Sequence, residues 1–298
     1  MSGTDALQGS FTPLVTPFDT DGNIDLKTYE AMVERQITEG SHGIVVAGTT
    51  GEPSLLSVPE RQSLAECALD VAQGRIPVMV ATGSQSLAET IELTSHADRV
   101  GAAAVLIVTP YYIRPPQRGL VEYFAVAAAY TEKPMLVYHI PGRAGVDVTI
   151  DTLARLQERI PNFVGIKHAS ADLGLISDAL SRLGADFKIF VGLEELSLPM
   201  LALGAVGMVN AVGNIVPNTL VRLCDAARAG DLAEARRLHY ELLELNRSVF
   251  FETNPIPIKY MMKRLGVLDD NRHRLPMVPA SPEVEVRLDA VLANAGLV

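Results

Sequence analysis

The sequence predicts an α/β fold, a (β/α)8 or TIM barrel followed by a C-terminal helical region. Three observations support this. Eight short runs rich in Val and Ile recur along the chain, the segments between them have helical periodicity, and the strand pattern stops near residue 215. Successive runs begin about 19 to 34 residues apart, which suits a strand, a crossover helix and their connections. We therefore expect a barrel over residues 1–215 and a helical region over 216–298.

The eight apolar runs are expected to be buried strands, since each is short and bounded by Gly, Pro or charged residues. In chain order they are Ser10–Val15, Gly43–Ala47, Pro77–Ala81, Ala103–Val108, Pro134–Tyr138, Phe163–Lys167, Phe187–Val191 and Val206–Asn210.

The intervening segments are expected to be helices, and several begin after an Asp or Ser that can serve as an N-cap. Clear examples are Leu26–Glu39, Pro59–Gln73 and Leu87–Val100, and the C-terminal helices are Asn218–Ala229, Leu232–Val249, Ile256–Leu265 and Glu283–Ala295. A doubly wound open sheet is the alternative. It is disfavoured because the turn after the first strand, residues 16–19, lacks the glycines of a dinucleotide cradle.

Composition narrows the possible functions. The chain is 48% hydrophobic, which excludes disorder as a description of the whole, and its net charge of -10 makes nucleic acid an unlikely partner. The amino terminus lacks a signal pattern and no long apolar run could span a membrane, so we expect a cytoplasmic protein. Cys67 and Cys224 are expected to be packing residues, and the six His show no spacing typical of a metal site.

Reactive residues are sought just after each predicted strand, because in this fold the active site lies where the strands end. Gly48 to Glu52 follow the second strand and offer hydroxyls and free amides that suit a small carboxylate. Tyr138 ends the fifth strand, and Arg143 follows it beyond a tight turn. Lys167 ends the sixth strand.

Lys167 is the strongest candidate for a nucleophile. Only six lysines occur in the chain, and the other five fall on predicted helices, in a turn or near the start of a strand. A lysine at the end of a buried strand is costly to desolvate, and this environment favours the neutral amine that forms a Schiff base. A structural ion pair with Glu52 or Glu194 is the alternative.

Three hydroxyl groups could move the protons that imine chemistry requires: Thr50, Tyr112 and Tyr138. The tyrosine pair 111–112 could instead be packing aromatics. The guanidinium of Arg143 could bind a substrate carboxylate through a bidentate pair of hydrogen bonds, or form a salt bridge with Asp147.

With these residues the chain resembles the superfamily of dihydrodipicolinate synthases and N-acetylneuraminate lyases, which are class I, pyruvate-dependent aldolases. The resemblance runs nearly end to end. Its motifs are Gly48–Glu52, Pro110–Tyr112 with Arg114-Pro115, Tyr138–Arg143, Gly165–Lys167, Asn254–Lys259 and Arg274–Met277.

The resemblance implies that Lys167 condenses with pyruvate without any cofactor or metal, and that Tyr138 transfers protons through a relay with Thr50 and Tyr112. It implies that the pyruvate site includes Thr49, Thr50, Gly192 and Val209. It also implies a homo-oligomer, expected to be a tetramer built as a dimer of dimers, in which the tyrosine at 112 faces a neighbouring active site.

The Arg143 motif is most similar to that of the dihydrodipicolinate synthases, in which this arginine binds the carboxylate of aspartate semialdehyde. The implied reaction joins pyruvate to that aldehyde and cyclises the product in lysine biosynthesis. His139, His168, Ala144 and the Leu193-Glu194-Glu195 segment depart from the family pattern, and we expect them to line the second-substrate region. The alternatives are a paralogous aldolase or hydratase-lyase acting on another 2-oxo acid, and a catalytically silent oxo-acid sensor or scaffold.

Feedback regulation is a separate question. Tyr111 and Glu89 match lysine-binding positions of inhibited bacterial members of the family, whereas Val58, Arg61 and Gln85 do not. We therefore expect weak or absent inhibition by lysine.

Overall fold

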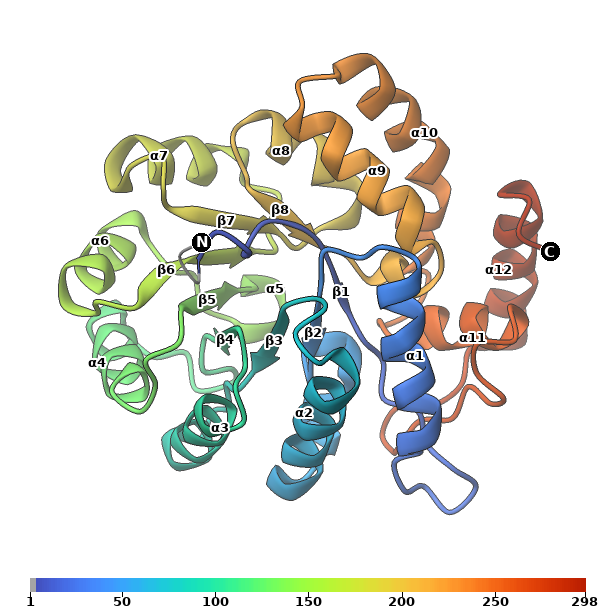
Figure 1. The fold of residues 1–298 in the computed structure, drawn as a ribbon, viewed down its shortest axis with the longest axis horizontal. Helices are drawn as coiled ribbons and strands as arrows, with labels where there is room; N and C mark the ends of the chain where they lie inside the picture. The colour runs from blue at the N-terminus through green and yellow to red at the C-terminus, as the bar shows by residue number, and fades with distance from the viewer. Residues whose placement is uncertain (1–3) are drawn as a thin grey trace.

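The computed structural model describes residues 4–298, and the first three residues of the predicted barrel region lie outside the described part. Eight parallel strands pair in chain order, and β1 also pairs with β8, so the sheet closes on itself (Figure 1). The predicted (β/α)8 barrel is confirmed, and the closure excludes the open doubly wound sheet.

All eight predicted strands form, with ends that differ from the predicted ends by a few residues. They are β1 (Gly9–Pro13), β2 (Gly43–Val46), β3 (Val78–Ala81), β4 (Ala104–Val108), β5 (Met135–His139), β6 (Phe163–His168), β7 (Lys188–Val191) and β8 (Gly207–Val209). Alternate side chains point to opposite faces of each strand. One buried cluster, which includes Phe11, Met79 and Phe190, fills the barrel interior, and a larger cluster lies between the sheet and the helices.

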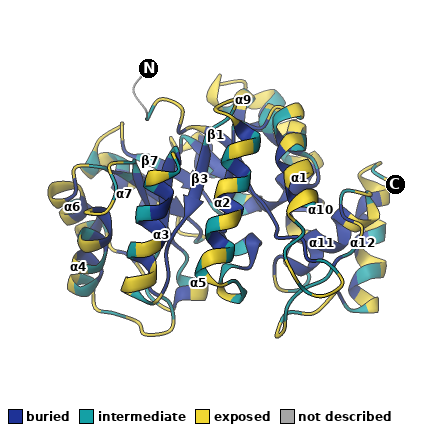
Figure 2. Ribbon diagram, turned by 60° about the horizontal axis from the view of Figure 1, so that its bottom comes forward, coloured by how far each residue is buried: buried dark blue, intermediate teal, exposed yellow. Residues whose placement is uncertain are grey.

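Helices surround the barrel and expose one face to solvent while burying the other (Figure 2). They are α1 (Leu26–Thr38), α2 (Val58–Ala72), α3 (Leu87–Arg99), α4 (Gln117–Ala128), α5 (Pro141–Ala144), α6 (Ile150–Arg159), α7 (Leu173–Leu183) and α8 (Ser197–Ala202). Local sequence fixes where several begin. Ser57 and Glu60 form a reciprocal capping box at α2, for example.

The C-terminal region is helical, as predicted. It comprises α9 (Pro217–Arg228), α10 (Leu232–Ser248), α11 (Ile256–Arg264) and α12 (Pro282–Asn294). Helix α9 packs against β1 and α8, whereas α11 and α12 lie beside the barrel, beyond α1 in Figure 1. The division of the chain at residue 215 stays a prediction.

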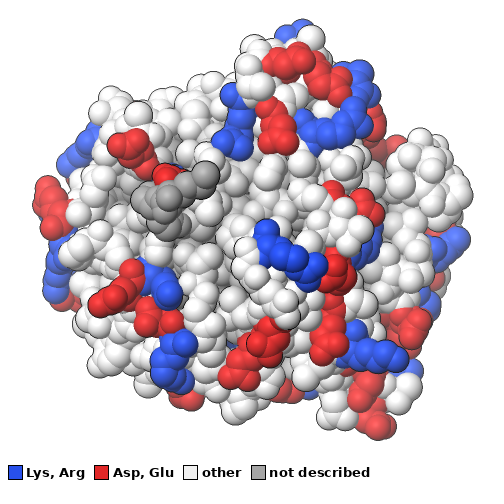
Figure 3. Space-filling view, in the orientation of Figure 1, with Lys and Arg blue, Asp and Glu red and all other residues white. Residues whose placement is uncertain are grey.

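The distribution of surface charge and the length of the helices both bear on which partners the protein could bind. On the face seen in Figure 3, Lys and Arg side chains are interspersed with Asp and Glu. Among residues 4–298, none of the helices has the length and apolar character needed to cross a membrane.

Candidate active site

Lys167 lies where the sequence predicts it, at the carboxyl end of β6, and only 5% of the residue is exposed. It is paired in register with Tyr138 of β5, and its Nζ atom lies 4.0 Å from the centroid of the Tyr138 ring. Both side chains line a cavity of about 200 Å³ at the end of the barrel. The predicted nucleophile and the predicted proton-transfer group are therefore neighbours.

The ion pairs that could have given Lys167 a purely structural role are not present in the described part of the chain. Glu52 instead pairs with Lys259, at 2.5 Å, and with His273, at 2.9 Å. Glu194 accepts a hydrogen bond from the Ala211 backbone N–H at 2.9 Å. Within residues 4–298 Lys167 forms no salt bridge, which leaves its amino group available for a ligand in the cavity.

Gly192 and Val209, which the resemblance assigns to the pyruvate site, also line this cavity. A Cβ atom at Gly192 would lie 3.0 Å from Lys167 Cε and 2.8 Å from Ala169 Cβ. Any larger residue would therefore crowd the lysine side chain.

The two threonines after β2 have different partners, and the relay role of Thr50 stays a prediction. Thr49 Oγ1 donates a hydrogen bond of 3.2 Å to the Tyr138 hydroxyl, whereas Thr50 Oγ1 accepts one of 3.1 Å from Asn254 Nδ2. Both threonines line the cavity of Lys167. The short 3₁₀ turn formed by Thr49–Gly51 turns the two hydroxyls in different directions, so the structure brings Thr49 rather than Thr50 to the phenol.

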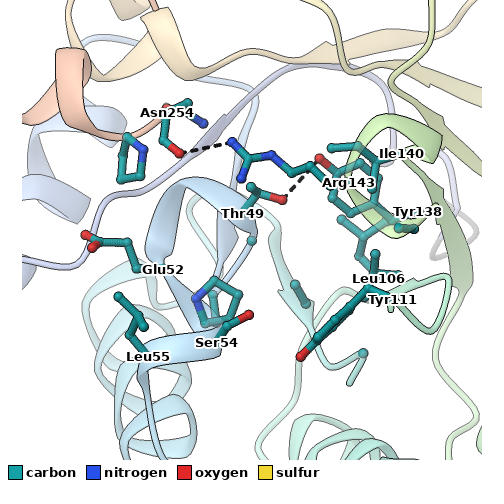
Figure 4. A pocket seen from close by; sticks show the side chains of 18 of the residues that line it. Thr49, Glu52, Ser54, Leu55, Leu106, Tyr111, Tyr138, Ile140, Arg143 and Asn254 are labelled. Atoms are coloured by element: carbon teal, nitrogen blue, oxygen red, sulfur yellow. Dashed lines mark hydrogen bonds between the residues drawn. The ribbon is translucent and has the colours of Figure 1, made fainter. Parts of the chain in front are cut away.

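Arg143 lies on the short helix α5, which the sequence analysis predicted only as a tight turn, because four residues are too few to show a helical period. Its guanidinium donates a hydrogen bond of 3.2 Å to the backbone carbonyl of Asn254 (Figure 4). The alternative salt bridge with Asp147 is not formed, because the Asp147 carboxylate contacts His139.

A second cavity, of about 310 Å³, shares Thr49, Tyr138 and Arg143 with the first and extends toward Tyr111 (Figure 4). Tyr112 lines neither cavity. It is 87% exposed and has a φ of 74°, so this chain alone does not bring it to Lys167.

Two site residues make contacts that the sequence does not predict. Asn254 contacts both Thr50 and Arg143 from the C-terminal region, far away in the chain, although its motif was part of the resemblance. Glu194 lines the cavity of Lys167, and burial raises the pKa of its carboxyl group. The acidic pair at 194–195, directly after a strand end, was the available signal.

Among the residues expected near the second substrate, Ala144 and the 193–194 segment do line the cavities. His139 and His168 do not: they are buried on the opposite faces of their strands from Tyr138 and Lys167. Within residues 4–298, no three His, Cys, Asp or Glu side chains are grouped so that they could hold a metal ion.

A closed (β/α)8 barrel whose strand ends bring a lysine, a tyrosine and threonines around one cavity defines a barrel enzyme. The chain belongs to the Dihydrodipicolinate synthetase family, which it matches over residues 6–295. It is 45% identical over 291 residues to the 4-hydroxy-tetrahydrodipicolinate synthase of Thermus thermophilus, covering 97% of each chain. It is 41% identical to that of Nitratidesulfovibrio vulgaris, covering 98% and 99%. The structure of dihydrodipicolinate synthase from Aquifex aeolicus superposes with a TM-score of 0.95 at 39% identity, covering 97% of this chain and 98% of that one.

Proposed function

We propose that this chain is a class I lyase that condenses pyruvate with L-aspartate 4-semialdehyde to give 4-hydroxy-tetrahydrodipicolinate, a step of lysine biosynthesis. The observation that carries the proposal is the placement of Lys167: buried, without an ion-pair partner among the described residues, and beside the Tyr138 phenol. Family membership over almost the whole chain supports the same reaction.

In the first half-reaction, Lys167 Nζ attacks the carbonyl carbon of pyruvate, a C=N bond forms and water leaves. The Tyr138 hydroxyl supplies the proton that the departing oxygen needs, and Thr49, hydrogen-bonded to it, passes protons along. The pyruvate carboxylate is bound by the hydroxyls and amides of Thr49 and Thr50, beside Gly192 and Val209. The protonated imine itself is the electron sink, so this mechanism requires no cofactor.

In the second half-reaction, the protonated imine loses a proton from its methyl carbon to give the enamine. That carbon then attacks the aldehyde, whose oxygen takes up a proton to become the hydroxyl, while Arg143 pairs with the carboxylate of that substrate. The amino group of the semialdehyde then attacks the imine carbon, which closes the ring and releases Lys167. Arg143 is suited to this role because it lines both cavities and donates only to a backbone carbonyl in the described structure.

The proposal includes a homo-oligomer, as a dimer of dimers, in the cytoplasm. The loop after β4 supports a covering partner, because it exposes 87% of Tyr112 and 59% of Ile113. In such an oligomer Tyr112 would join the relay of the neighbouring protomer. Sedimentation equilibrium of the wild type and of Tyr112→Arg tests this: the wild type should be a tetramer, and the variant should dissociate.

Steady-state kinetics test the reaction. Turnover of pyruvate with L-aspartate 4-semialdehyde is compared with retro-aldol cleavage of a panel of 2-oxo acids, including sugar acids and aromatic catabolites. We expect kcat/KM to be highest for the first pair. A far higher kcat/KM for another 2-oxo acid would overturn the lysine-pathway assignment.

A further inference from the structure

The mechanism leaves two buried histidines unused, although they adjoin its two central residues. His139 and His168 are paired in register at the ends of β5 and β6, one residue beyond the Tyr138 and Lys167 pair. They are 2% and 0% exposed. Because strand side chains alternate, they lie on the outer side of the sheet, between the strands and the surrounding helices and loops.

The two histidines form a continuous chain of polar contacts. Their Nδ1 atoms lie 3.1 Å apart, with the rings stacked at an interplanar angle of 25°. At one end of the chain, His168 Nε2 lies 2.9 Å from the carbonyl oxygen of Asp172. At the other end, His139 Nε2 lies 3.3 Å from Asp147 Oδ1.

The direction of each hydrogen bond follows from the chemistry of the end groups. A carbonyl oxygen only accepts, so His168 Nε2 must carry a proton. Neutral His168 then accepts at Nδ1. Neutral His139 has one N–H and faces two acceptors, His168 Nδ1 and the Asp147 carboxylate, so one of its two contacts lacks a hydrogen. When it donates to His168, its Nε2 keeps a lone pair that faces the carboxylate.

One additional proton, on His139 Nε2, removes this mismatch and completes every hydrogen bond in the chain. A second would place two N–H groups face to face across the 3.1 Å between the rings. The pair is therefore built to hold one added proton, and with that proton it binds Asp147.

The surrounding groups set the pH at which the proton is taken up. Asp147 faces the pair from the segment after α5, Asp172 faces it from the N-terminus of α7, and β7 contributes the apolar Val191. Burial lowers the pKa of both histidines, and Asp147 partly offsets this for His139. Uptake of the added proton therefore needs a lower pH than protonation of a free imidazole does.

Asp147 ends the segment 140–147, which carries Arg143 on the short helix α5. One end of this segment is fixed by β5. The other is held by the hydrogen bond from Gln117 Nε2 to the Asp147 carbonyl, 2.7 Å, and by the contact with His139. A contact that fixes Asp147 therefore also restrains the segment 140–147, which carries Arg143.

We propose that His139 and His168 are positioning residues for the second substrate: by sharing one added proton they bind Asp147, fix the segment that carries Arg143, and so tighten binding of the carboxylate-bearing aldehyde. This inference rests on the proposed function. It concerns the aldehyde half of the reaction, because Arg143 is the residue assigned to that substrate, whereas pyruvate is assigned to the cavity of Lys167.

The test is the pH dependence of KM for each substrate, measured between about pH 5 and 8. In the wild type, KM for L-aspartate 4-semialdehyde should rise about two- to fivefold as the pair loses its proton, because solvent around the exposed Asp147 carboxylate screens the ion pair. KM for pyruvate should not show this step.

Asp147→Asn is the decisive variant, because its amide can donate to neutral His139 and the carboxylate mismatch disappears. The side chain of Asp147 is 75% exposed, so the variant should fold, and it should lose the pH step in KM for the aldehyde. Asp151→Asn is the matched control. It removes a carboxylate of similar exposure, 72%, that pairs with Arg182 on the outer helices, and it should keep the step.

His139→Gln serves as a second variant, since it removes the site of the added proton and should also flatten the aldehyde profile. A purely structural role would lower kcat or thermal stability at every pH but leave the step in place. An unchanged step in Asp147→Asn, or no step in the wild type, would overturn the inference. Absence of any wild-type turnover with the semialdehyde would instead overturn the proposed function.

Discussion

Two lysines are almost completely buried, and they differ in what surrounds the amino group. Lys259, on α11, pairs with Glu52 and donates to the Arg272 carbonyl at 2.8 Å. Lys167, at the end of β6, lines a cavity and forms no salt bridge within residues 4–298. Burial lowers the pKa of Lys259, and Glu52 opposes that shift. Burial alone therefore does not identify a reactive lysine; the absence of a fixed partner and the presence of a cavity do.

The largest expected effect is the loss of catalytic activity when Lys167 is replaced. Lys167→Ala should reduce turnover by at least about 10³-fold, because no other lysine among residues 4–298 lines this cavity. Its far-UV circular dichroism and thermal unfolding should stay close to those of the wild type. Steady-state kinetics check this, and substantial residual activity would show that imine formation occurs elsewhere.

The second-largest expected effect is on the stability of the fold and comes from replacing Lys259. Lys259→Met should lower the free energy of unfolding by about 3–5 kcal/mol, because it leaves the buried Glu52 carboxylate without its cation. Urea denaturation measures the change. Lys263→Met, on the exposed side of the same helix, is the control and should change stability by less than about 0.5 kcal/mol. Equal effects of the two substitutions would contradict a structural ion pair at Lys259.

These comparisons show how much of the site could be predicted from the sequence. Parallel strands end on one side of a barrel, so Tyr138, Arg143 and Lys167 could be brought together from strand positions alone. The choice between Thr49 and Thr50 depends on a 3₁₀ turn that has no sequence period. Asn254 reaches the site from the C-terminal region through tertiary packing, which no local pattern encodes.

The two histidines show which part of the site strand alternation predicts. Strand alternation places His139 and His168 opposite their inward-facing neighbours, which would have excluded them from the cavities at once. Their mutual contact, in contrast, required the strand register. Side-chain direction is thus predictable within one strand, whereas pairing between strands is not.

Arg143 is a third cation of the site and, unlike the two buried lysines, it lies at the protein surface. Arg143 is exposed and lies on a four-residue helix. Arg143→Ala should raise KM for L-aspartate 4-semialdehyde by an amount equivalent to about 1.5–3 kcal/mol, the loss of a charged hydrogen bond, and leave KM for pyruvate nearly unchanged. Initial rates at varied concentrations of each substrate distinguish the two. Equal changes in both KM values would contradict an arginine dedicated to the aldehyde.

The smallest expected effect concerns Arg61, a buried cation without an acidic hydrogen-bond partner in the described structure. Its guanidinium donates to the carbonyls of Ala81 and Gly83 and lines the larger cavity beside Tyr111. Burial lowers its pKa to about 10, so it stays charged at neutral pH and repels a ligand ammonium group. Added lysine should therefore inhibit weakly or not at all in a coupled assay. Inhibition at micromolar lysine would contradict this.

The most direct test of the central claim is reductive trapping. Borohydride added with pyruvate should inactivate the enzyme irreversibly, and peptide mass spectrometry should find one reduced pyruvate on Lys167 and none on Lys259. Borohydride alone should leave activity intact. Retention of activity after treatment with both reagents, or an adduct on a different lysine, would contradict the assignment of Lys167 as the Schiff-base residue.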